Sequence, residues 1–162
     1  MCHHFEHKEE VFFALIARYL PTFLQAFEMH LPETAHIEDN LMAIALAGME
    51  YFGELILMSA SFLADTELLA QYRQKMSKVT SEQQSGGPQH IENLLATYLE
   101  EERQLGRLQS PTTSRALALL LLGACFQNTY LSQLMGTPPA GKVREQFARE
   151  LVRGTLGDSQ PS

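Results

Sequence analysis

The feature that most constrains the fold is an uninterrupted apolar run of eleven residues, 116–126. It is too short to span a membrane, which takes roughly 18 apolar residues or more. We therefore expect it to lie in a helix of a globular protein. One buried face of such a helix needs only about half of its positions to be apolar. The opposite face must be covered too, and a second copy of the chain is the simplest cover.

The remaining chain repeats apolar residues at three- and four-residue spacings, and no segment alternates as a strand does. Ser110 and Pro111 predict a helix start, because the hydroxyl can cap the helix and proline suits its first turn. Gly106 is placed to end the preceding helix, and Pro21 predicts a kink in the first. The fold class is therefore all-α, with about six helices. They are predicted at residues 8–31, 36–64, 65–78, 88–105, 111–135 and 142–156.

Composition places the chain among soluble globular proteins, since 45% of its 162 residues are hydrophobic and 19% are charged. Its two cysteines form no disulfide framework, and no secretory leader opens the sequence. We therefore expect a cytoplasmic protein that does not engage a membrane. The net charge is −7. Because neutralising phosphates supplies much of the affinity for DNA, this chain is not expected to bind DNA unaided.

Catalytic groups are sparse, and the chain is not expected to be an enzyme. Cys125 lies within the apolar run, where a buried thiol is usually inert. Glu50 and Glu54 are four residues apart and share one face of the second predicted helix. They either line a solvated edge, or one of them makes a polar contact inside a pocket.

A cluster of soft and imidazole ligands stands near the start of the sequence, at Cys2, His3, His4 and His7. A histidine third from a free amino terminus can chelate copper or nickel, but this requires Met1 to be the true terminus. First-row metals also bind many such sites incidentally. No metal and no cofactor is predicted.

Aromatic and methionine residues on helices expected to converge could line an adaptable apolar pocket, with a polar group to orient the ligand. Ordinary core packing explains the same pattern, and both interpretations stay open. The effector would be an apolar or aromatic small molecule. The candidate ligand-binding residues are Phe23, Phe27, Met49, Phe52, Met58, Phe62, Tyr98, Phe126, Gln127 and Tyr130.

The residues His4-Phe5, Lys8-Glu9 and Val11 resemble the end of the recognition helix and the start of the next helix in TetR-type (tetracycline-repressor-like) transcriptional regulators. Cys2 and His3 stand where that family commonly has tyrosine. Residues 98–111, which precede the long apolar helix, also resemble the junction before the family's dimerisation helices.

The resemblance implies a ligand-responsive transcriptional regulator, of which this chain is the small-molecule-sensing and dimerisation part. Residues 1–7 would end a DNA-binding domain, 8–157 would bind the effector and dimerise, and 158–162 would be a disordered tail. His4 and Lys8 would approach DNA phosphates, but only once a helix-turn-helix domain is present.

The resemblance also implies a homodimer whose last two long helices form a four-helix bundle between subunits. The candidate interface residues lie on those two helices. They are Leu117, Leu121, Ala124, Asn128, Phe147 and Leu151.

Two other functions compete with this prediction. The chain could be a helical protein–protein interaction module whose first helix docks a partner, because exposed apolar patches often mark interfaces. It could also be a small helical-bundle enzyme, although no acid–base or metal constellation supports that function.

Overall fold

The structure of the protein, a computed structural model, describes residues 2–29, 35–79, 89–137 and 141–157, without the side chains of residues 2–9, 11–13, 15–17 and 79. These described residues form six α-helices and no strand, which confirms the all-α fold. The predicted tail at 158–162 lies outside them. The helices are α1 (Cys2–Met29), α2 (Ile37–Ala64), α3 (Thr66–Val79), α4 (His90–Gln104), α5 (Ser114–Met135) and α6 (Gly141–Leu156).

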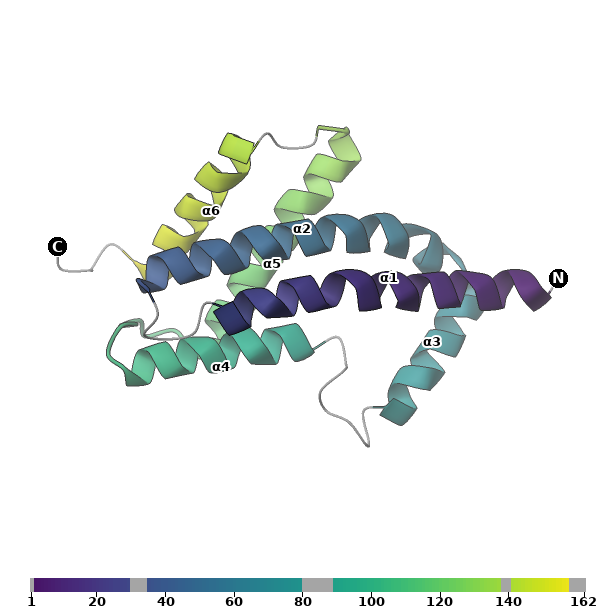
Figure 1. Ribbon diagram of the computed structural model, residues 1–162, viewed down its shortest axis with the longest axis horizontal. Coiled ribbons are helices and arrows are strands. Elements are labelled where there is room, and N and C mark those ends of the chain that lie inside the picture. Colours follow the sequence, from purple (N-terminus) through teal and green to yellow (C-terminus); the bar gives the residue numbers. More distant parts are fainter. Residues whose placement is uncertain (1, 30–34, 80–88, 138–140, 158–162) are drawn as a thin grey trace.

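Helix α2 is the centre of the fold and packs against α1, α3, α5 and α6 (Figure 1). Its buried positions include Leu41, Ile44, Ala45, Gly48 and Met49, which recur at three- and four-residue spacings and form one broad inward face. Helix α4 packs mainly on α5 and also contacts α1. The central helix is therefore covered by neighbours on several sides.

Gly48 of α2 allows a close helix contact. A Cβ atom at this position would lie 3.4 Å from two ring carbons of Phe23 on α1. The Phe23 ring also stacks on Tyr51, with the ring centroids 5.4 Å apart. Glycine at position 48 therefore lets α1 approach α2 closely.

The start of α5 differs from the prediction. The helix begins at Ser114, and the Thr113 hydroxyl caps it by accepting a hydrogen bond from the Ala116 backbone N–H at 3.2 Å. Ser110 was the wrong cap, because its hydroxyl accepts from the Thr112 N–H at 3.2 Å inside the preceding turn. The Arg103 guanidinium holds this turn by donating to the carbonyls of Ser110 and Thr112.

Other helix ends agree more closely with the sequence. Asp65 caps α3, since its Oδ1 accepts from the Leu68 backbone N–H at 3.0 Å. Gly106 has a φ of 76°, the left-handed conformation expected after α4. Helix α1 begins at Cys2, earlier than predicted, and runs without a break past residue 8 and through Pro21. The expected kink at Pro21 stays a prediction.

Two of the helices, α2 and α5, are long and apolar enough to cross a membrane when judged by length and composition alone. Core helices of soluble proteins meet the same criterion, so it is weak evidence for a span.

Candidate functional site

The predicted ligand-binding aromatics include a connected series of rings that runs from the core to the surface. Phe23 and Phe27 on α1 are buried, with centroids 5.5 Å apart in an edge-on contact. Phe52 lies 6.5 Å from Phe23 and 5.4 Å from Phe126 of α5. Phe126 stacks on Tyr130 at 6.4 Å, and both are exposed. The structure thus links α1, α2 and α5 through aromatic packing.

The other predicted ligand residues lie elsewhere. Met49 is buried in a second cluster beside Cys125, and Phe62 contacts Tyr72 where α2 meets α3. Met58 packs against a third cluster, which Phe62 forms with Leu68. Tyr98 is buried on α4, and Gln127 is exposed on α5. The ten residues are therefore distributed among three packed clusters and the surface of α5.

The core between α2, α4 and α5 is well filled. The void lined by Leu41, Ile44, Leu95 and Leu121 has a volume of about 10 Å³. A space of that size holds at most about one water molecule. A ligand at this position would have to displace side chains.

The outer side of α5 carries an exposed apolar surface. Residues 116–135 contain no Asp, Glu, Lys or Arg. Seven large apolar side chains on this helix are between 41% and 73% exposed. Single exposed apolar residues are common on protein surfaces, but so many on one helix are unusual. We call them the α5 outer face. They are Leu119, Leu120, Phe126, Tyr130, Leu131, Leu134 and Met135.

Two of the predicted interface residues on α5 face the core of their own chain. Leu117 and Leu121 are only 4% and 2% exposed, because they belong to the inward stripe that packs on the rest of the core. Ala124 and Asn128 are half-buried. Phe147 and Leu151 of α6 are also half-buried and pack against the cluster around Met49. The exposed apolar positions of α5 are instead those of the α5 outer face.

A buried polar group joins the end of α4 to the start of α2. Glu102 and Asn40 are 0% exposed, and Glu102 Oε2 lies 2.8 Å from Arg107 Nε. Arg107 also donates to the carbonyl of Ala35. Burial raises the pKa of Glu102, and Arg107 opposes that rise. Burial likewise raises the pKa of the neighbouring Tyr98 to about 12.

This buried group was not predicted from the sequence. The only signal was an arginine that closely follows three consecutive glutamates, 100–102. Such a pattern usually indicates a solvated helix face. The group fixes the loop after α4 against the segment before α2, so its role is structural.

Cys125 is 1% exposed and its Sγ lies 3.8 Å from the carbonyl oxygen of Ala45. Burial raises the pKa of the thiol to about 12. The thiolate, which is the nucleophilic form, is therefore scarce at neutral pH. This environment agrees with the inert role expected from the sequence.

The structure does not describe the side chains that were predicted to approach DNA phosphates, nor those considered and rejected as metal ligands. His4 and Lys8 lie within α1, but their side chains are outside the described set, as are those of Cys2, His3 and His7. Among the described side chains, no group of three or more His, Cys, Asp or Glu residues could hold a metal ion.

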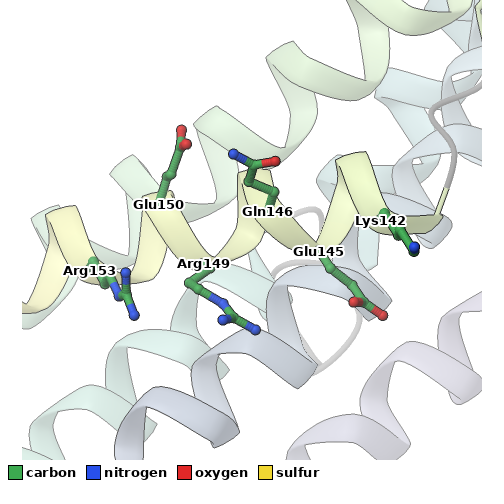
Figure 2. A pocket seen from close by; sticks show the side chains of 6 residues that line it. All are labelled: Lys142, Glu145, Gln146, Arg149, Glu150 and Arg153. Carbon is green, nitrogen blue, oxygen red and sulfur yellow. The ribbon is translucent and has the colours of Figure 1, made fainter.

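Helix α6 presents a charged surface hollow of about 430 Å³. Figure 2 shows that all of its lining side chains come from this one helix, with Gln146 and Glu150 on one side and Glu145 and Arg149 on the other. Arg153 at its end pairs with Glu38 of α2 at 3.5 Å. A hollow formed by one helix does not enclose a ligand, and its mixed charges are typical of a solvated face.

Comparison with known proteins finds no match among protein-family models, curated proteins or solved structures. The resemblance to TetR-type regulators therefore rests on the short motifs quoted above.

Proposed function

We propose that the chain pairs with a second copy of itself through the α5 outer face. In this proposal it is the sensing and dimerisation part of a ligand-responsive, TetR-type transcriptional regulator in the cytoplasm. The observation that carries the pairing is the exposed apolar surface of α5. The regulatory role is supported by the sequence motifs around His4 and Lys8.

Charge supports a second copy as the occupant of this face. Each chain carries a net charge of −7, so two copies repel one another over most of their surfaces. Residues 116–135 contain no charged side chain, so this repulsion is weakest there. A two-fold interface places the same patch on both subunits, and an uncharged apolar patch is compatible with itself.

The shape of α5 also suits helix packing. Gly123 is exposed on this helix, and a Cβ atom built on it would have nothing within 4 Å. The backbone of a partner helix can therefore approach closely at this position. Leu120 and Phe126 lie on either side of it in sequence and would supply apolar contacts.

The effector in this proposal is an apolar or aromatic small molecule that contacts the aromatic residues of α1, α2 and α5. Its binding would regulate DNA only by favouring one of two conformations. The acidic chain needs a helix-turn-helix domain for DNA binding, because base-reading side chains come from such a unit.

A pair of matched leucines tests the pairing. Leu120 on the α5 outer face is 62% exposed, and Leu63 at the end of α2 is 61% exposed. Burying the exposed part of Leu120 in both subunits contributes about 2–4 kcal/mol, so Leu120→Glu should weaken the dimer at least about 30-fold. Leu63→Glu should leave the dimer constant unchanged. Sedimentation equilibrium measures both, and equal effects of the two variants would contradict the proposal.

A further inference from the structure

A polar cleft of about 430 Å³ lies between α2, the end of α5 and the start of α6. None of the residues that line it is aromatic, so it is not formed by the rings that end at Tyr130. Its volume falls within the range of small-molecule sites, roughly 300–1,000 Å³. Unlike the hollow on α6, it is formed by three helices, so side chains from different directions can contact one ligand.

Side chains of opposite charge line this cleft without forming an ion pair among the described residues. Glu50 and Glu54 come from α2, and Arg144 comes from α6. Within the described part of the chain, no ion pair joins Arg144 to either glutamate. The Nε atom of Arg144 is buried and has no hydrogen-bond partner there. A buried donor without a partner is uncommon in folded proteins, so the Arg144 guanidinium keeps unused hydrogen-bonding capacity beside the cleft.

The remaining polar groups of the cleft offer mainly hydrogen-bond acceptors. The Thr129 hydroxyl donates to the Cys125 carbonyl at 2.7 Å, and the Ser132 hydroxyl donates to the Asn128 carbonyl at 2.9 Å. With their protons used in this way, both hydroxyl oxygens can only accept from a ligand. The two glutamate carboxylates also accept, whereas Arg144 is the charged donor.

We propose that this cleft binds a small basic amino acid. Its ammonium groups would bind Glu50, Glu54 and the hydroxyl oxygens, and its carboxylate would bind the Arg144 guanidinium. The three charged side chains sum to −1, which matches an amino acid that carries two ammonium groups and one carboxylate. This inference does not depend on pairing, because all of the residues come from one chain.

Isothermal titration calorimetry with L-lysine and with 1,5-diaminopentane tests the assignment, because the diamine is lysine without its carboxylate. Wild-type protein should bind lysine at least about tenfold more tightly than the diamine, since the diamine cannot pair with Arg144. Arg144→Gln should remove this preference by weakening lysine alone. Glu54→Gln should weaken both compounds at least about tenfold.

Glu67→Gln on the exposed side of α3 is the control, and it should bind both compounds as wild type does. Circular dichroism should show that every variant is folded. The same titration on Leu120→Glu separates the two proposals, because lysine should bind whether or not the chain pairs. Absence of lysine binding at about 10 mM, beyond the millimolar range of weak specific binding, would overturn the assignment. So would unaltered binding by both Glu54→Gln and Arg144→Gln.

Discussion

Replacing Arg107 with methionine should strongly destabilise the fold, because it leaves the Glu102 carboxylate buried without its cation. Glu102 is 0% exposed and lies 2.8 Å from Arg107 Nε. At that distance two unit charges in an effective dielectric of about 20 attract by about 6 kcal/mol. Desolvation of the two ions offsets several kcal/mol of this attraction while the pair is intact.

Removal of one partner of a buried ion pair costs about 3–5 kcal/mol. Because the Arg107 side chain is 28% exposed, we expect the lower end of that range. Even about 3 kcal/mol is a large share of the 5–15 kcal/mol by which a typical domain is stable. Urea denaturation of Arg107→Met and wild type, followed by circular dichroism, gives the difference directly.

Arg115→Met is the matched control. Arg115 pairs with Glu92 at 3.3 Å, but its side chain is 71% exposed. Loss of an exposed pair costs roughly 0–1 kcal/mol. If Arg107→Met and Arg115→Met lower the unfolding free energy equally, the structural importance assigned to the Glu102–Arg107 pair is wrong.

The pH dependence gives a second readout of the same pair. Burial raises the folded-state pKa of Glu102, and loss of Arg107 should raise this pKa further. A raised carboxyl pKa means that the folded state holds its proton at a higher pH than the unfolded state does. The stability that comes from this proton binding is fully present below the pKa that Glu102 has in the unfolded state. It is lost as pH rises through the pKa that Glu102 has in the folded state. The deficit of Arg107→Met relative to wild type should therefore be smaller near pH 5 than near pH 7.5.

Three further predictions concern packing and helix ends. Cys125 should resist modification by a thiol reagent in the folded protein and react only on unfolding, because burial raises its pKa to about 12. Mass spectrometry of the labelled peptide tests this, and equal labelling of folded and unfolded chains would contradict it. Gly48→Ala should change the unfolding free energy by less than about 1 kcal/mol, whereas Gly48→Leu should lower it by more than about 2 kcal/mol because the leucine side chain would clash with the Phe23 ring. Similar denaturation midpoints for the two variants would be inconsistent with the close contact. Thr113→Ala should lower the unfolding free energy, measured by thermal denaturation, by about 1 kcal/mol through loss of the α5 cap, and Ser110→Ala should lower it less. A larger loss for Ser110→Ala would instead indicate that Ser110 is the cap.

Helix number and approximate bounds could be predicted because most helices show a clear spacing of apolar residues. The exact start of α5 could not, because Ser110 and Thr113 are both competent caps. The choice between them depends on Arg103, whose guanidinium binds the carbonyls of the turn between them. That contact joins α4 to the turn and has no signature in the local sequence.

The orientation of α5 could not be predicted for a different reason. An eleven-residue run that is apolar on all sides contains no polar face to show which side faces the solvent. Leu117 was therefore expected outside and lies inside, whereas Leu120 is exposed. The sequence left open whether Glu54 lies on a solvated edge or in a pocket. The cleft that it lines is completed by Arg144, which comes from a helix far away in the sequence.

The central proposal is that the chain pairs through α5, and the mass of the wild-type protein in solution tests it most directly. Sedimentation equilibrium at tens of micromolar should give about twice the 18.2 kDa of one chain. A single species at 18.2 kDa across that concentration range would contradict the pairing.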